Sequence, residues 1–154
     1  MTSRLLYRIA AVLILLFDAG HSAAFPWSDP RWGVDTSAMR SSHFQILGFS
    51  RTYWHFYVGS GLTVGVFLLL AAVLAWQLGG LSGQTFLPLR ATAWGLALTF
   101  VALTVLNWMY FFTIPIVFSG LIAVCLVAAT SLATRAARDE ATAPASNRAT
   151  VHRG

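Results

Sequence analysis

Apolar residues occur along this chain in four long stretches, separated by shorter segments in which polar residues, glycine and proline collect. Each stretch contains about 20 residues or more, and a helix of that length crosses ~30 Å of hydrocarbon at a rise of about 1.5 Å per residue. The predicted spans are residues 5–25, 53–78, 88–110 and 115–134. The pattern therefore predicts an all-α fold, with one domain over residues 1–134 that forms a bundle of four transmembrane helices.

Proline and glycine mark how these helices meet. Pro88 and Pro115 suit the first turns of the third and fourth helices, where a missing N–H removes no intrahelical bond. Residues 111–114 form so short a connection that these two helices must be antiparallel neighbours. Gly61 and Gly65 form a small-xxx-small pair in the second span, which predicts the close approach of another helix or of a helical partner.

Two segments lie outside the spans. The first connection, residues 26–52, is long and contains many large apolar side chains, so we expect it to lie on the membrane surface or to fold over the bundle. Thr36 and Ser37 could begin a short interfacial helix that continues through residues 38–47. Residues 135–154 are rich in Ala, Thr, Arg and Asn, which predicts a disordered tail.

Composition agrees with a membrane protein and excludes other classes. The 154 residues are 57% hydrophobic and 10% charged, well below the roughly 25% charged content of soluble domains. The ten arginines form neither a stripe nor an alternation with aromatic residues, so a nucleic-acid surface is not expected. The single cysteine, Cys125, lies in the last span and allows no intrachain disulfide.

The arginines also predict an orientation. Four crossings place both termini on one side, together with the second connection. That side carries Arg4, Arg8, Arg90, Arg135 and Arg138, whereas the first connection carries Arg31, Arg40 and Arg51. The positive-inside rule therefore predicts that both termini are cytoplasmic and that the long first connection is extracytoplasmic.

The first span has a second interpretation. Two arginines, an apolar core and the small residues at 22–24 resemble a secretory signal peptide, whose cleavage would remove this helix. Asp18 and His21 lie close to the supposed cleavage site, however, and the apolar character continues through Phe25. We therefore favour a retained transmembrane helix.

Because successive spans cross the membrane in opposite directions, the end of the first, the start of the second, the end of the third and the start of the fourth share the outer face. Polar residues gather at these span ends. The candidate pocket residues are Asp18, His21, Arg51, Tyr53, His55, Asn107 and Tyr110. Asp18 and His21 are three residues apart and so share one side of a helix. Because a charge inside the membrane costs about 3 kcal/mol on insertion scales, these groups need partners or a function. One polar pocket near the outer surface explains them better than several isolated buried groups.

Several roles are open for these residues. Asp18 could handle protons or act as a counter-ion, or it could form a structural ion pair with Arg51 between the first two helices. His21 and His55 could be general acid–base groups or hydrogen-bonded packing residues. No tight His-x-x-x-His or Glu-x-x-His spacing links His21, His55, His43 and Asp18, so no metal site is predicted.

Two motifs support a family resemblance. They are the Gly-His pair at residues 20–21 and the run Arg-Thr-Tyr-Trp-His-Phe-Tyr-Val-Gly at residues 51–59. With these motifs, residues 8–134 resemble a family of small uncharacterised bacterial four-helix membrane proteins. The resemblance implies a bacterial cytoplasmic (inner) membrane but no activity, and it implies an acidic residue where this chain has His55. A looser similarity in size and span count to the DoxX-like group is architectural only.

Three functional hypotheses follow from the pocket. The first is an integral membrane protein that binds a small or lipidic ligand in the outer-facing polar pocket. The second is a membrane enzyme that performs proton-transfer or redox chemistry on a quinone- or isoprenoid-type substrate. The third is a structural or assembly subunit of a membrane complex. No completed catalytic or cofactor motif distinguishes them, so neither an enzymatic activity nor a cofactor is assigned.

Overall fold

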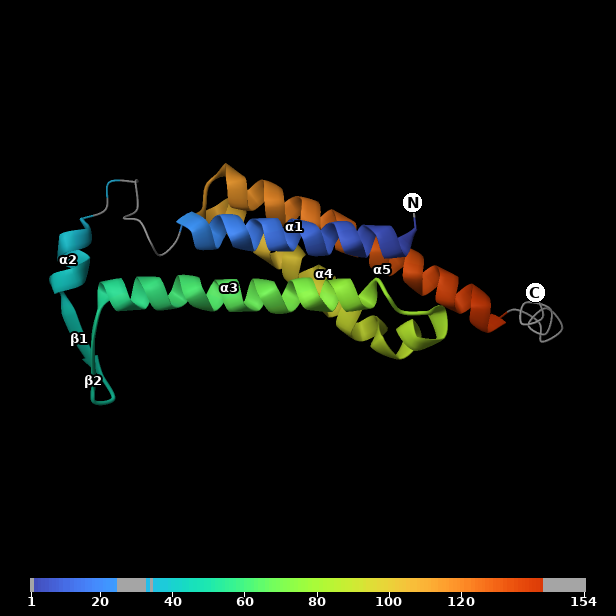
Figure 1. The fold of residues 1–154 in the computed structure, drawn as a ribbon, viewed down its shortest axis with the longest axis horizontal. Coiled ribbons are helices and arrows are strands. Elements are labelled where there is room, and N and C mark those ends of the chain that lie inside the picture. The colour runs from blue at the N-terminus through green and yellow to red at the C-terminus, as the bar shows by residue number, and fades with distance from the viewer. Residues whose placement is uncertain (1, 25–32, 34, 143–154) are drawn as a thin grey trace. The chain divides into compact units, whose positions relative to one another are not determined.

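The computed structural model describes residues 2–24, 33 and 35–142. Four long helices dominate it, namely α1 (Ser3–Ala24), α3 (Tyr53–Leu78), α4 (Gly83–Tyr110) and α5 (Thr113–Thr142) (Figure 1). Each is long and apolar enough to cross a membrane. The predicted all-α fold with four spans is confirmed. The chain divides into two compact units, one formed by Met1–Ile14 with Ala71–Gly154 and the other by Leu15–Leu70.

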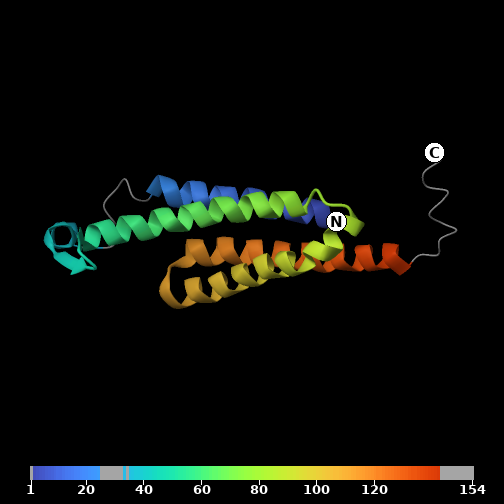
Figure 2. The same ribbon diagram turned by 90° about the horizontal axis from the view of Figure 1, so that it is seen from below.

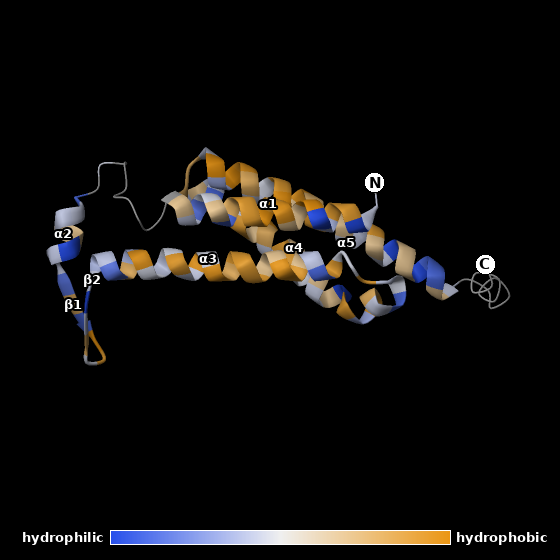
Figure 3. Cartoon of the chain, in the orientation of Figure 1, coloured by the Kyte–Doolittle hydropathy of each residue, from blue (hydrophilic) through white to orange (hydrophobic). Residues whose placement is uncertain are grey.

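The long helices keep most of their apolar surface outward. Only 22–33% of each span's most apolar window is buried inside the protein, although hydrophobic residues predominate along all four helices (Figure 3). Leu16, Val66 and Val124 are among the large apolar side chains that remain exposed. Outward apolar surface on this scale is unfavourable in water and suits a hydrocarbon environment. The protein is accordingly described as a multi-pass membrane protein.

Helix boundaries correct part of the sequence prediction. The second span is found over the predicted residues, Tyr53–Leu78, and Pro115 lies in the first turn of α5 as expected. Pro88, in contrast, lies inside α4, which already begins at Gly83. α5 continues past the predicted end at residue 134 to Thr142, so residues 135–142 are helical and do not belong to a disordered tail. Residues 143–154 lie outside the described residues.

The first unit is built on the pair α4 and α5, which lie side by side and antiparallel, as predicted (Figure 2). Many of the buried residues of this pair are small, which lets the two backbones approach closely. Close packing matters here because lipid provides no hydrophobic driving force between helices, so van der Waals contact must supply the attraction. The buried residues of this pair are Phe86, Ala93, Leu96, Ala97, Phe100, Ser119, Ile122, Ala123, Leu126, Ala129, Thr130 and Ala137. Tyr7 of α1 is buried in the same unit, with its ring 6.4 Å from that of Phe86.

The second unit contains a short helix and a β-hairpin, and the sequence pattern did not predict the hairpin. The helix expected from Thr36 does begin there as α2 (Thr36–Ser41), but it does not continue through residue 47. Strands β1 (His43–Ile46) and β2 (Phe49–Thr52) follow and pair antiparallel. Their two-residue turn places Leu47 at φ 51° and Gly48 at φ 84°, the pair of positive φ angles that a tight hairpin requires. Residues 25–32 and 34 of this connection lie outside the described residues.

Candidate functional site

Asp18 is a buried carboxylate on α1, and most of its neighbours in the sequence are apolar. Its side chain is 7% exposed, and its Oδ1 accepts a hydrogen bond of 3.4 Å from Ser22 Oγ, one helical turn later. Gly65 of α3 faces the same carboxylate, since a Cβ added there would lie 3.2 Å from Oδ1. Only a residue without a side chain leaves the carboxylate this space without a shift of the surrounding atoms.

His21 connects the same two helices one turn further along. Its Nε2 lies 3.0 Å from the carbonyl oxygen of Gly61, and because a carbonyl only accepts, Nε2 carries the proton in this contact. The small-xxx-small pair of Gly61 and Gly65 therefore receives a helix of the same chain, with one glycine opposite His21 and the other opposite Asp18. The predicted neighbours Asp18 and His21 are brought together with the predicted close-approach site.

His55 has a local role at the start of α3. The side-chain Nδ1 of His55 accepts a hydrogen bond from the backbone N–H of Thr52 at 3.2 Å, and the backbone N–H of His55 donates to Thr52 Oγ1 at 3.2 Å. This reciprocal pair is a capping box in which histidine replaces the usual glutamate or glutamine. An acidic side chain at this position would accept the same bond. His55 thus caps the start of α3, directly after β2, and both of its described hydrogen bonds belong to that cap.

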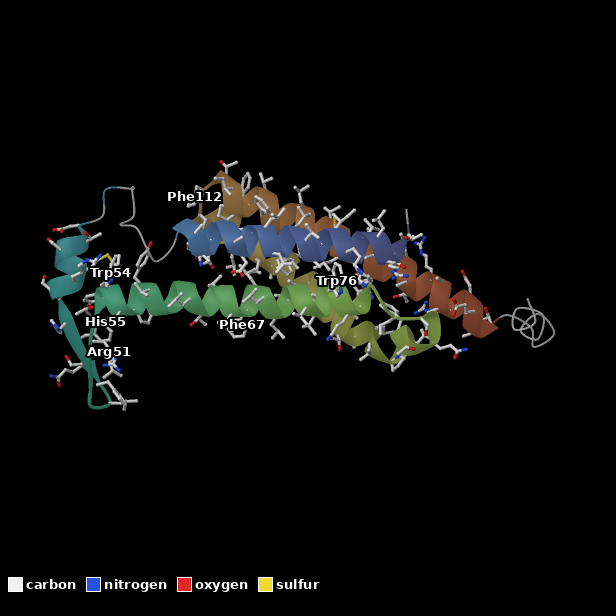
Figure 4. All side chains as sticks on the ribbon, viewed as in Figure 1. Arg51, Trp54, His55, Phe67, Trp76 and Phe112 are labelled. Atoms are coloured by element: carbon white, nitrogen blue, oxygen red, sulfur yellow. The ribbon has the colours of Figure 1, made fainter. Side chains whose placement is uncertain are left out.

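The predicted ion pair between Asp18 and Arg51 is absent from the described part of the chain. Arg51 is exposed on β2, where its Nη1 donates to the carbonyl of Ser50 at 2.8 Å and its guanidinium lies 5.4 Å from the ring of Phe49 (Figure 4). Asp18 lies opposite Gly65, and the twelve residues from the start of α3 to Gly65 rise about 18 Å. That separation exceeds the reach of an arginine side chain, so the prediction of an ion pair is wrong.

The other predicted pocket residues have separate surroundings. The ring of Tyr53 packs 5.3 Å from that of Phe44, which joins the hairpin to α3. Asn107 belongs to the first unit, where its Nδ2 donates to the carbonyl of Pro115 at 3.2 Å and to Ser119 Oγ at 3.1 Å. It therefore fixes the turn between α4 and α5. Tyr110, at the end of α4, is 70% exposed.

A polar cavity of about 330 Å³ lies in the first unit, at a place where the sequence analysis expected no site. The start of α1, the connection from α3 to α4 and the last turns of α5 form its walls. It is lined by Ser3, Arg4, Tyr7, Leu78, Gly79, Gly80, Leu81, Ser82, Gly83, Phe86, Ala133, Ala136 and Glu140. A Cβ added at Gly83 would collide with the carboxylate of Glu140, so an anionic group already occupies the N-terminal end of α4, where the helix dipole favours it.

Two residues of these sites carried only weak signals in the sequence. Ser22 stood out only as a small residue of a possible cleavage site, yet its hydroxyl is the described hydrogen-bond donor to Asp18. Its spacing of four residues from Asp18 on a helix could have identified it. Glu140 lies in a segment that was assigned to the tail. Within the described residues no group of three or more His, Cys, Asp or Glu side chains could hold a metal ion.

Comparisons of the chain with protein-family models, with curated proteins and with solved structures give no match. No activity can therefore be transferred from a relative.

Proposed function

We propose that this multi-pass membrane protein binds a small or lipidic ligand that donates a hydrogen bond to Asp18. We also propose that it resides in a bacterial cytoplasmic membrane, with both termini in the cytoplasm and the hairpin outside, as the arginine distribution predicts. In this orientation the half of α1 that carries Asp18 lies toward the outer surface.

The unmet hydrogen-bonding capacity of Asp18 is the observation that supports the proposal. An ionised carboxylate has about four lone-pair sites, and Asp18 has one described hydrogen bond, at the long distance of 3.4 Å. A buried charge without sufficient partners costs several kcal/mol. A ligand that brings one or two donors to this carboxylate would offset the cost.

The surroundings restrict the chemistry of such a ligand. Asp18 accepts and does not donate when ionised, so the ligand must present a hydroxyl, an amine or an N–H group. The rest of the ligand must be compatible with an apolar helix inside the membrane, which favours a lipid alcohol, an aminolipid or a reduced quinone over a sugar or nucleotide. Ser22 offers a second polar contact beside the carboxylate.

A structural role is the second candidate, and the contact of His21 favours it. The 3.0 Å distance from Nε2 to the Gly61 carbonyl joins α1 to α3, and Asp18 fits against Gly65 on the same side. The two groups could serve only to hold these helices together in a larger assembly. Proton-transfer chemistry has less support, because the Nε2 of His21 is already engaged with a backbone carbonyl.

The carboxylate can be tested with one isosteric substitution and a matched control. The full chain and the variants Asp18→Asn and Asp35→Asn are purified in a mild detergent, and the bound lipids and small molecules are extracted and identified by mass spectrometry. We expect a molecule with a hydroxyl or amine donor in the parent and in Asp35→Asn, and at least tenfold less of it in Asp18→Asn. Asp35 caps α2 and makes the same change of charge away from the site.

Two results would contradict the proposal. Equal amounts of the molecule in Asp18→Asn and the parent would show that the carboxylate does not hold it. A parent that carries no such molecule, together with a folded but clearly less stable Asp18→Asn variant, would support the structural candidate.

A further inference from the structure

Arg8 is a cation placed within a membrane-spanning helix and held against an aromatic ring. It lies in α1, inside the candidate span Ser3–Ala23, and its guanidinium carbon is 3.4 Å from the ring centre of Trp76 in α3. Trp76 is two residues from the end of its helix and is labelled in Figure 4. Stacking on an aromatic face orients the guanidinium plane and leaves its N–H groups directed around the edge of the ring.

The N–H donors of Arg8 have no acceptor among the residues that the structure describes. Neither a hydrogen bond nor an ion pair is formed by this side chain there, and Nη1 is fully buried without a partner. Arginine stays charged at any physiological pH and carries five donors. A buried donor of this kind is rare and calls for an acceptor beyond those that the described residues supply.

A shallow apolar groove runs along α1 beside the side chain of Arg8. It has a volume of about 250 Å³ and is lined by Arg8, Ile9, Val12 and Leu13, which follow one side of α1 toward the membrane interior. Gly80 lies beside the charge, since a Cβ added there would be in ordinary van der Waals contact with Nη2 of Arg8, at 3.8 Å. A cation beside an apolar groove matches a molecule with an anionic head and a hydrocarbon chain.

The depth of Arg8 favours a phospholipid over a soluble anion. Arg8 is five residues into α1, about 7.5 Å from its start, and tryptophan at a helix end is typical of the headgroup level. We propose that Arg8 and the groove along Ile9, Val12 and Leu13 bind an anionic phospholipid. Its phosphate accepts hydrogen bonds from the guanidinium, and one acyl chain lies in the groove.

The proposal can be tested by ligand-induced stabilisation of the purified, delipidated full chain in dodecyl maltoside. Thermal unfolding is measured against increasing concentrations of a palmitoyl-oleoyl phosphatidylglycerol, of the matching phosphatidylcholine, and of inorganic phosphate. A lipid that binds only the folded state raises the unfolding temperature with a midpoint set by its affinity. We expect the phosphatidylglycerol midpoint to lie at least tenfold below that of phosphatidylcholine, with no stabilisation by inorganic phosphate over the same range.

Variants locate the effect. Arg8→Gln should raise the phosphatidylglycerol midpoint about tenfold or more, and Arg8→Lys should raise it less because it keeps the charge but loses the planar fork. Arg90→Gln is the control, because it removes the same charge from an exposed position of α4. Val12→Trp keeps the cation and fills the groove from an exposed position, so it should also weaken lipid binding.

Several outcomes would overturn the inference. An unchanged midpoint in Arg8→Gln would remove Arg8 from the site, and an equal loss in Arg90→Gln would indicate general attraction to the net charge. Stabilisation by inorganic phosphate at a comparable concentration would indicate a soluble anion. If Arg8→Gln does not fold, Val12→Trp becomes the deciding variant. Phosphatidylglycerol binding by Val12→Trp at the parent's midpoint would refute the proposal that an acyl chain lies in the groove. Asp18→Asn should bind phosphatidylglycerol like the parent, which separates this site from the one at Asp18.

Discussion

A buried hydrogen bond between Tyr7 and Thr130 should contribute measurably to stability. The two hydroxyl oxygens lie 2.7 Å apart, and they join α1 to α5 across 123 residues of sequence. Tyr7 is 1% exposed and Thr130 is not exposed at all, so water cannot replace either partner. The decisive perturbation is the pair of near-isosteric substitutions Tyr7→Phe and Thr130→Val, each of which removes one hydroxyl and little volume.

The expected magnitude follows from the burial and from the alternatives left to each group. Side-chain hydrogen bonds between membrane helices contribute about 0.6 kcal/mol on average and up to about 1.7 kcal/mol. The short distance and complete burial place this bond toward the upper part of that range. The Thr130 hydroxyl can fall back on a carbonyl one turn earlier, as Thr134 does with the carbonyl of Thr130 at 2.7 Å, which limits the loss. Tyr7→Phe should therefore cost about 1 kcal/mol.

The assay is reversible unfolding of the purified chain in mixed micelles of dodecyl maltoside and sodium dodecyl sulfate, followed by tryptophan fluorescence. We expect Tyr7→Phe and Thr130→Val to lower the free energy of unfolding by about 1 kcal/mol each, and the double variant to cost about as much as one of them. Thr99→Val is the matched control, because Thr99 bonds only the carbonyl of Gly95 in its own helix turn. Strictly additive losses, or a loss as large in Thr99→Val, would refute the interhelical bond.

The remaining predictions concern the segments outside the membrane and the orientation. The Ser37 hydroxyl, followed by the backbone N–H of Ala38, holds the pKa of Asp35 below its usual range. The cap of α2 should therefore be intact above the usual carboxyl pKa of about 4 and be lost as pH falls through the lowered value. The protection factor of the Ala38 amide, the intrinsic exchange rate divided by the observed rate at each pH, should fall on acidification, but not in Asp35→Asn, and a pH-independent protection factor in the parent would contradict this. Reporter fusions after Gly83 and after Gly154 should both read cytoplasmic, and a periplasmic signal from either would reverse the proposed orientation.

The membrane-spanning part of the fold was predictable because a bilayer imposes a minimum length on any apolar helix. The apolar run of the second span begins at Tyr53 and finishes at Leu78, and α3 has the same first and last residues. The end of α5 was missed because residues 135–142 are polar. Their Ala, Arg and Glu side chains nevertheless favour helix, and Glu140 has a place beside Gly83. Polarity there marks departure from the membrane and not the end of the helix.

The hairpin was missed for a different physical reason. The alternation of polar and apolar residues over His43–Ile46 has the period of a strand, but only a short stretch shows it. Leu47 in the turn hides the signal further, since a bulky residue at positive φ is uncommon and glycine or asparagine is usual. The error at Arg51 follows from this one, because a residue expected to lie beside the end of a span is in fact the third residue of β2.

The neighbourhood of Asp18 and His21 was predictable from the sequence, whereas the other residues assigned to the same pocket were not. Asp18 and His21 were recognisable because polar groups are costly inside an apolar helix, and the glycine pair that receives them was recognisable from its spacing. Asn107 and His55 were assigned to the same pocket because sequence places them near span ends. Both proved to cap or fix a local turn, a role that depends on backbone groups and leaves no pattern in the side chains.

Polar side chains in these spans differ in whether the helix itself can satisfy them. Thr63, Thr99 and Thr134 each donate to the carbonyl four residues earlier, so they need no partner outside their own helix. A carboxylate cannot do this because backbone carbonyls offer it no donor, and a guanidinium has more donors than one turn can accept. Asp18 and Arg8 are the cases on α1 where this mismatch is greatest. Asp18 requires donors and Arg8 requires acceptors, and this difference is why we propose a hydrogen-bond donor as the partner of Asp18 and an anionic phosphate as the partner of Arg8.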